Sequence, residues 1–234
     1  MAGWCYQGDS DNNETVKLAV YACQAPGLKR TIVVVSGEQA HAKGADGALR
    51  AKRWLEATTR ANVPWVNPDP VAVPKLSFLW VDGGGSFSFD LGGTLIGGDI
   101  ANQEFLAESK KYDNASHQNS MYNEYLAKCY VARRQRPDRC DNFMWITWSA
   151  FATTTWSDLV SADRVRSSVL KECKRALGVE EENAPAEIDD ALCKDVATRL
   201  WIIVLSDRQE KHLILSAEHQ GLIRKHIAEE AART

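Results

Sequence analysis

Two acids and a lysine near the middle of the chain have the residue types and spacing that metal-assisted phosphodiester chemistry uses. Glu108 and Lys110 lie in the run EFLAESKKY. On a strand, side chains two positions apart share a face and lie about 7 Å apart along the backbone. Asp90 ends the run SFSFD, eighteen positions before Glu108. If the two strands pair antiparallel, both carboxylates reach one cation, and the backbone carbonyl of Ser109 supplies a third oxygen.

The chemistry that this arrangement predicts is hydrolysis assisted by a metal ion. Mg²⁺, or Mn²⁺ in its place, binds carboxylate oxygens, stabilises charge on a phosphate and lowers the pKa of a bound water. The ammonium group of Lys110 then steers or activates that water. Because burial of both charges on an apolar face would be costly, this face is expected to open on a cleft or to hold a metal.

Further candidates follow the charged strand. Gln118 and Tyr122 lie four apart, on one helix face, where they could contact a backbone phosphate or hold a catalytic side chain. The alternative is a polar first turn and a core-facing tyrosine. A basic cluster follows, which could track a phosphate backbone or coat a solvated surface. The candidate nucleic-acid contacts are Lys111, Arg133, Arg134 and Arg136.

The elements that must position these residues follow from the apolar patterns, which predict an α/β domain with a central mixed sheet flanked by helices. A strand is expected at 30–37, followed by a helix that ends before Pro64. The proline-rich run after it is a connector. Next come hairpin-linked strands at 75–82, 86–90 and 104–112, a helix from about Ser116 to Pro137, and a strand at 142–148. Helices near 157–177 and 186–198, a fully apolar strand at 199–207 suited to a sheet interior, a short strand at 212–216 and a closing helix from 217 complete the chain.

Length and composition favour one domain over 1–234, with a core at about 38–150 that residues 156–234 complete. Apolar residues make up 44% and charged residues 25%, an ordinary globular balance. The net charge of −3 excludes a polycation. Nucleic-acid binding would therefore need a local basic surface, or metal ions that offset the carboxylates.

Several other classes of site are not expected. The six cysteines form no C-x-x-C pair, which argues against zinc, and no lysine–serine or lysine–threonine pair follows the glycines, which argues against a P-loop. A second acid-x-lysine triplet, Glu172 to Lys174, lies in a helical run and is interpreted as a solvated face. With no membrane-length apolar run and no export signal, a cytoplasmic protein is expected.

With Asp90, the triplet Glu108-Ser109-Lys110 and the Q-x-x-x-Y pattern that starts at Gln118, the sequence resembles the PD-(D/E)XK nuclease superfamily over about residues 43–148. That superfamily includes restriction endonucleases, Holliday-junction resolvases and RecB-like nucleases. The resemblance implies a restriction endonuclease-like αβββαβ core. It also implies that the two acids hold Mg²⁺ while the lysine assists the attacking water.

The sequence departs from the family pattern in one place and leaves a choice in another. Phe89 occupies the position of the proline that precedes the aspartate. Some members carry an additional metal-positioning acid on the first helix. Asp46 and Glu56 are the two candidates here, and Asp46 fits the resolvase-like pattern better.

These observations predict a Mg²⁺-dependent endo- or exodeoxyribonuclease that acts on DNA, with a helicase or ATPase partner, a homodimeric state, and phage defence or DNA processing as its setting. The alternative is a non-catalytic subunit that retains the nuclease fold and binds nucleic acid or recruits a partner. A nucleotide-dependent enzyme that uses the glycine-rich hairpins is a third hypothesis. Metal binding that Asp90→Asn weakens would separate the first from the second.

Overall fold

The computed structural model describes residues 37–110 and 118–233. Residues from Ala42 onward form one compact unit. The strand expected at 30–37 lies outside the described residues except for Gly37, which instead begins a helix, and Lys111 lies outside them too. Among the described helices, none combines the length and the apolar character that crossing a bilayer requires.

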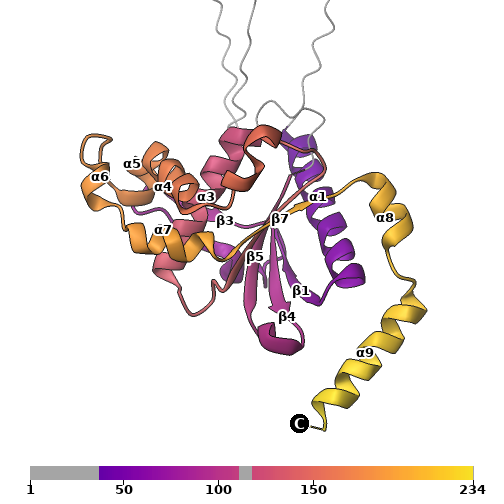
Figure 1. Ribbon diagram of the computed structural model, residues 1–234. Coiled ribbons are helices and arrows are strands. Elements are labelled where there is room, and N and C mark those ends of the chain that lie inside the picture. The colour runs from indigo at the N-terminus through magenta and orange to yellow at the C-terminus, as the bar shows by residue number, and fades with distance from the viewer. Residues whose placement is uncertain (1–36, 111–117, 234) are drawn as a thin grey trace, which may run out of the picture. The chain divides into compact units, whose positions relative to one another are not determined.

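A mixed five-stranded sheet forms the centre of this unit, in the order β1-β4-β5-β6-β7 (Figure 1). β1 (Ala61–Val66), β4 (Leu91–Leu95) and β5 (Glu104–Lys110) pair antiparallel. β6 (Asn142–Thr147) and β7 (Leu200–Val204) continue the sheet parallel to β5. The predicted α/β class with a mixed sheet is therefore confirmed.

Two of the strands predicted for this sheet lie elsewhere. β2 (Ser77–Leu79) and β3 (Ser86–Ser88) form a separate two-stranded hairpin. Their places in the sheet are taken by β1 and β4. The sequence predicted the end of a helix and a connector where β1 lies, and a turn where β4 lies. The glycines of β4 permit close strand packing, because a Cβ at Gly93 would collide with the backbone carbonyl of Asn62 in β1.

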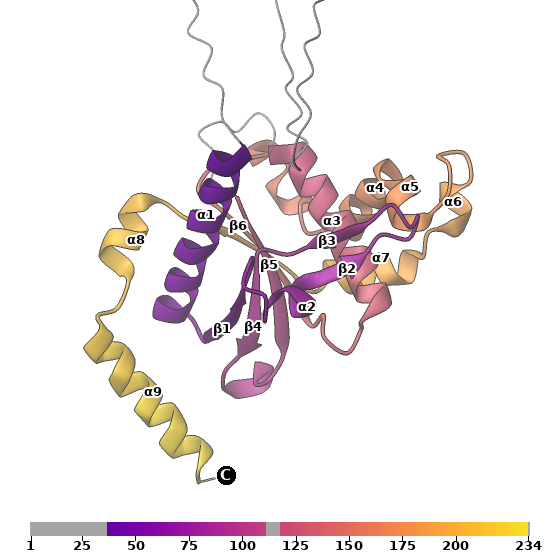
Figure 2. The same ribbon diagram turned by 180° about the vertical axis from the view of Figure 1, so that it is seen from behind.

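Helices cover both faces of the sheet (Figures 1 and 2). On one face, α1 (Gly37–Thr58) packs Ala51 and Leu55 into a cluster with Phe105 and Ile146. The other face holds α3 (Gln118–Gln135), which connects β5 to β6, and the helices between β6 and β7. The α-helices of that stretch are α4 (Ala162–Lys171), α5 (Cys173–Leu177), α6 (Ala184–Glu187) and α7 (Asp190–Ala197). The remaining helices are α2 (Val73–Leu76), η1 (Gly98–Ile100), η3 (Thr153–Asp158), α8 (Asp207–Leu213) and α9 (Ala217–Ala231).

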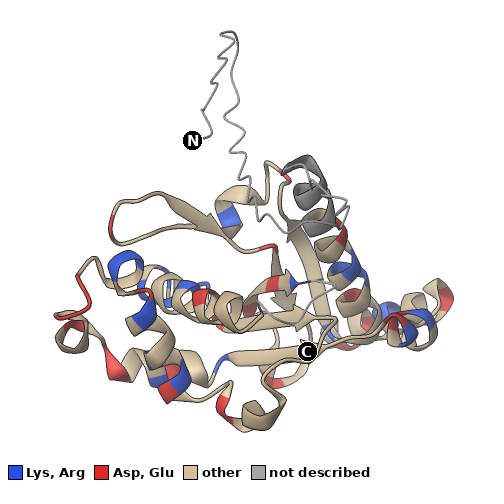
Figure 3. Cartoon of the chain, turned by 90° about the horizontal axis from the view of Figure 1, so that it is seen from above, with Lys and Arg blue, Asp and Glu red and all other residues tan. Residues whose placement is uncertain are grey.

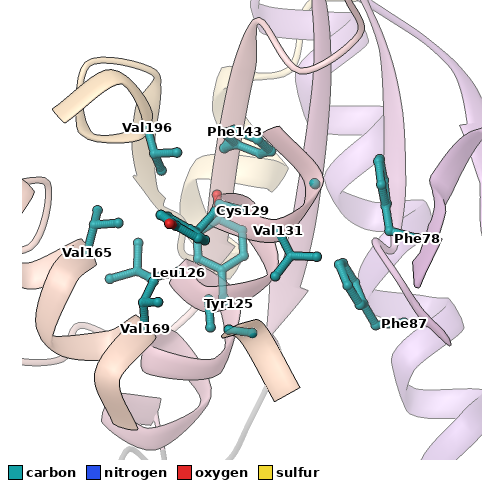
Figure 4. Packing of buried hydrophobic residues seen from close by; sticks show 14 of the residues in the cluster. Phe78, Phe87, Tyr125, Leu126, Cys129, Val131, Phe143, Val165, Val169 and Val196 are labelled. Carbon is teal, nitrogen blue, oxygen red and sulfur yellow. The ribbon is translucent and has the colours of Figure 1, made fainter. Parts of the chain in front are cut away.

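The larger hydrophobic cluster lies between the sheet and α3 (Figure 4). The hairpin contributes Phe78 and Phe87, whose rings stack with centroids 5.7 Å apart. α3 contributes Tyr122 and Tyr125, which pack against Trp145 of β6. The hairpin is thus part of the core packing although it is outside the sheet.

Two predictions about the C-terminal part of the chain are wrong. The apolar strand expected in the sheet interior is β7, which forms an edge, and Trp201 in it is 46% exposed. Its neighbour β6 is an interior strand, and the six residues of β6 are all buried. The short strand expected at 212–216 is instead the end of α8 and its connection to α9, because Ser216 caps α9 by accepting a hydrogen bond from the His219 N–H.

Candidate functional site

Four charged side chains meet at the carboxyl-terminal end of β5. This charge cluster consists of Asp90, Glu108, Lys110 and Lys128. Since side chains alternate along a strand, Glu108 and Lys110 share the face of Leu106 that packs against α3, whereas Ser109 lies on the α1 side. Figure 3 shows that charged positions gather on the helices and loops while the strands are mostly uncharged, so charges on an interior strand need a specific explanation.

Glu108 is the buried centre of the charge cluster, with a side chain only 5% exposed. Its Oε1 atom lies 2.7 Å from Lys110 Nζ and 3.4 Å from Lys128 Nζ. Burial alone would raise the pKa of this carboxyl, but the two ammonium groups hold the pKa below its ordinary value. Glu108 is therefore ionised at neutral pH. Its Oε2 atom is buried and accepts no hydrogen bond from a described residue.

Asp90 lies between β3 and β4, beside β5. Its N–H donates to the Ala107 carbonyl at 3.0 Å, which fixes the backbone against the strand. Its Oδ2 accepts hydrogen bonds from Ser109, at 2.8 Å from the N–H and 3.2 Å from the hydroxyl. Burial and the nearby Glu108 carboxylate raise the pKa of Asp90 to about 6. The charge of Glu108 thus raises the pKa of Asp90, while the two lysines and the hydrogen bond from Ser109 lower it in part.

The structure brings together the residues predicted from the sequence around Glu108 and adds one. Lys110 contacts Glu108, Ser109 contacts Asp90, and Glu108 influences Asp90 electrostatically. Ser109 does so through its N–H and hydroxyl donors, not through the carbonyl that was expected to hold a metal. Lys128 is the residue that sequence reasoning missed. It lies in α3, and only the packing of that helix against β5 places it beside Glu108.

Gln118 and Tyr122 are both fully buried. The Tyr122 hydroxyl donates to the Leu159 carbonyl at 2.8 Å, and burial raises its pKa. Tyr122 is therefore the core-facing tyrosine that the sequence offered as the alternative to a functional residue. Gln118 accepts a hydrogen bond from the Thr147 hydroxyl at 3.4 Å, next to Lys110 in the sheet, while its Nε2 is buried without a partner in the described chain. A catalytic role for this pair stays a prediction.

The two first-helix acids have different surroundings. The Glu56 carboxylate accepts hydrogen bonds from Lys52 at 3.0 Å and from the Val63 N–H at 3.2 Å, so it ties α1 to β1. Asp46 is exposed in α1, and its metal-binding role stays a prediction. Within residues 37–110 and 118–233, no group of three histidine, cysteine or acidic side chains is placed to hold a metal ion.

The predicted basic cluster is engaged largely in ion pairs. Arg133 lies 2.6 Å from Asp195, and Arg136 lies 2.9 Å from Asp138. Arg134 is exposed. Contacts of these arginines with nucleic acid stay a prediction, but for Arg133 the ion pair shows a structural role that joins α3 to α7.

Comparisons with known proteins return structures only: no family model and no curated protein matches the chain. A Moraxella osloensis Cap4 SAVED/CARF-domain containing receptor is 10% identical, with 72% of this chain and 33% of that one covered and a TM-score of 0.32. The Acinetobacter baumannii Cap4 receptor with the cyclic trinucleotide 2'3'3'-cAAA is 16% identical over 72% and 32%, with a TM-score of 0.35. A second structure of that receptor is 15% identical over 81% and 42%, with a TM-score of 0.36.

These comparisons correct the expected family and function. The structures that match are described as receptors and not as PD-(D/E)XK nucleases, and no nuclease family model matches. The expected superfamily membership, and metal-dependent DNA hydrolysis as the main function, are therefore wrong. The chain spans about a third to two fifths of the length of these receptors. Because the TM-scores are below 0.5, the likeness transfers neither a ligand nor an assembly to this chain.

Proposed function

We propose that this chain is a non-catalytic binding subunit that holds a phosphate-bearing ligand of the nucleic-acid class at the charge cluster. One observation carries the proposal: Lys110 and Lys128 converge on a single oxygen of the buried Glu108, at the end of a strand in the sheet interior. Glu108 holds the two ammonium groups close together. Their side chains remain 19% and 14% exposed, so each retains some surface for a ligand.

The charge balance of the cluster favours an anion over a cation near pH 6. Two ammonium groups face the ionised Glu108, and Asp90 has a pKa of about 6. The net charge is therefore close to zero at pH 7.5 and approaches +1 as Asp90 takes up a proton. A phosphate group bound by two lysines gains charge-assisted hydrogen bonds. Its affinity should rise as the pH falls from 7.5 to about 5.5.

A magnesium ion at the same cluster is a separate proposal. Glu108 Oε2 accepts no hydrogen bond from a described residue, and Asp90 lies beside it; hard carboxylate oxygens of this kind suit Mg²⁺. Two carboxylates fill only part of an octahedral shell, so we expect weak binding. When bound, the ion would offset the carboxylate charge and offer a ligand phosphate a further positive contact. Calorimetric titration with Mg²⁺ alone tests this, because Asp90→Asn should abolish the binding.

The setting is part of the proposal. We propose a cytoplasmic protein that works in antiviral defence, together with a helicase or ATPase that recruits it to nucleic acid. The ligand class supports this setting, since a subunit that only binds requires another protein to act. Copurification of the chain with such a partner from infected cells, lost when the partner is deleted, would test it.

Fluorescence anisotropy with labelled nucleic acids tests the binding site directly. The probes are a single-stranded DNA, a duplex and a cyclic trinucleotide, the ligand class named for one compared receptor. In EDTA, we expect Lys110→Ala and Lys128→Ala each to weaken binding of the preferred probe about tenfold and to lower the salt slope by about one. Lys174→Ala is the matched control, because Lys174 is 71% exposed on α5 and pairs with Glu180.

Two results would reject the proposal, each in a different part. Affinities that stay unchanged in Lys110→Ala and Lys128→Ala would reject the charge cluster as the binding site. Cleavage of the DNA probe with Mg²⁺ or Mn²⁺, lost in Lys110→Ala but kept in Lys174→Ala, would reject a non-catalytic role. A probe that stays intact, and that the wild-type protein binds more tightly than Lys110→Ala and Lys128→Ala do, supports both parts.

A further inference from the structure

In the described part of the chain, the last strand of the sheet has a neighbouring strand on only one of its two hydrogen-bonding sides. The strand order ends at β7, which pairs there with β6 alone. The five residues Leu200–Val204 are all apolar and none is fully buried. An open strand edge presents a row of backbone N–H and C=O groups that readily pair with another strand.

The opposite edge of the same sheet is protected in ways that β7 is not. β1 contains Pro64, which has no N–H to donate, and its register with β4 shifts between Asn62 and Trp65. Proline and bulges are two of the devices that keep edge strands from pairing. β7 has no proline and no charged residue, and its register with β6 runs without a shift. The β7 edge therefore lacks the devices that would keep it from pairing.

The direction of the backbone groups identifies the residues that would pair. The Arg199 carbonyl accepts from β6, and the Leu205 N–H donates to β6. Because backbone groups point alternately to the two sides of a strand, the odd-numbered residues of β7 bond to β6. Leu200, Ile202 and Val204 therefore direct their N–H and C=O groups toward the open edge.

We propose that β7 pairs antiparallel with β7 of a second copy of this chain, about a twofold axis at Ile202. In this register Ile202 faces its own copy, Leu200 faces Val204 and Trp201 faces Ile203. Each strand contributes three outward N–H groups, so the pair forms about six backbone hydrogen bonds. The contact is isologous and closes as a dimer with one continuous sheet. It is independent of the ligand proposed above.

The side chains around the axis favour self-pairing over pairing with a charged strand. All five facing positions are apolar. In the same register, Arg199 faces Leu205 and Asp207 faces Ala197, so like charges do not oppose each other. Arg199 is already paired with Asp195 at 2.8 Å. The Trp201 ring, which is 46% exposed, would cover Ile203 of the second copy.

Light scattering and analytical ultracentrifugation of the whole chain test the dimer. We expect the wild-type protein to dimerise at tens of micromolar concentration, and Trp201→Lys, which adds a protective charge to the edge, to raise the dissociation constant at least about tenfold. The exposed position of Trp201 should leave the fold intact, which circular dichroism and the melting temperature check. Leu222→Lys, at an exposed apolar position on α9, is the matched control and should dimerise normally.

Disulfide trapping tests the register independently of the affinity. Directly opposed residues of an antiparallel pair have Cα atoms about 5 Å apart, within the range of a disulfide. Ile202→Cys should therefore cross-link two chains under mild oxidation. Leu200→Cys should not, because it lies about 13 Å from its own copy along the strand. The wild-type chain gives the background from native cysteines.

Three outcomes would overturn the proposal. The first is a wild-type chain that stays monomeric at about 100 µM, as expected if another segment of the same chain covers β7. The second is a dimer that persists unchanged in Trp201→Lys. The third is cross-linking by Leu200→Cys as strong as that by Ile202→Cys, which would place the axis elsewhere. Disulfide cross-linking of Ile202→Cys but not of Leu200→Cys, together with a weaker dimer of Trp201→Lys, supports the proposal.

Discussion

Asp90→Asn is expected to stabilise the protein at pH 7.5 and to lose that effect at pH 4.5. The ordinary aspartate pKa of 3.8 applies to the unfolded chain, whereas the folded pKa is about 6. Between these values the folded state holds a proton that the unfolded state releases. Stability therefore falls as the pH rises from about 4 to about 6, and the loss is complete above the folded pKa.

The size of the effect follows from the two pKa values. Their difference corresponds to about 3 kcal/mol of unfolding free energy at pH 7.5. Asparagine keeps an oxygen for the Ser109 donors but weakens those hydrogen bonds and is itself desolvated, so we expect a net gain of about 1–2 kcal/mol. Lys110 and Lys128, the cations that face Asp90, hold the pKa of Glu108 below its ordinary value, so Asp90 is the carboxyl of the cluster that takes up a proton near pH 6.

Urea denaturation of the wild-type protein and Asp90→Asn at pH 4.5, 6 and 7.5 measures the gain. Asp138→Asn is a control of opposite sign, because Arg136 lowers the pKa of this exposed carboxyl. It should not stabilise the protein at any pH. An equal gain at all three pH values for Asp90→Asn, or a loss that deepens as the pH rises, would refute the electrostatic reasoning.

The remaining predictions concern packing around the charge cluster and the sheet, each measured by denaturation. Lys128→Met should cost about 1–3 kcal/mol because Glu108 keeps only one ammonium partner. In the Lys128→Met background, Glu108→Gln should cost at least about 1 kcal/mol less unfolding free energy than it costs in the wild-type protein. Additive costs in this double-mutant cycle would contradict the pairing. Tyr122→Phe should cost about 1–2 kcal/mol and leave oligonucleotide affinity unchanged; a large affinity loss would instead favour a functional role. Gly93→Ala should cost about 3 kcal/mol or more from its clash with Asn62, and an unchanged midpoint would argue against the β1–β4 packing.

Local patterns were sufficient for much of the fold. The period of apolar residues predicted α3, and the apolar run before Glu108 predicted β5. Each of these signals is contained in a short stretch of the sequence. β1 and β4 escaped the same reasoning. Pro64 and the glycines of β4 are typical of turns, and only their positions at an edge and in a close strand contact make them compatible with a sheet.

The functional interpretation failed for a different reason. Asp90, Glu108 and Lys110 do meet, as the spacing predicted. Three residue types at a suitable spacing, however, do not specify one reaction. The same carboxylates and ammonium groups suit metal binding, anion binding or a buried ion-pair network, and the spacing of residues does not distinguish these uses.

The sequence by itself determined the α/β class, the charged end of β5 and the helix that follows it, because alternation and helical periodicity are local properties. The tertiary structure alone decided that Lys128 reaches Glu108 and that β7, not β6, forms the open edge. Both depend on how the crossover helices return the chain to the sheet. Such contacts join residues that are distant in the chain, and their energies are determined by burial and electrostatics that no short run of residues specifies.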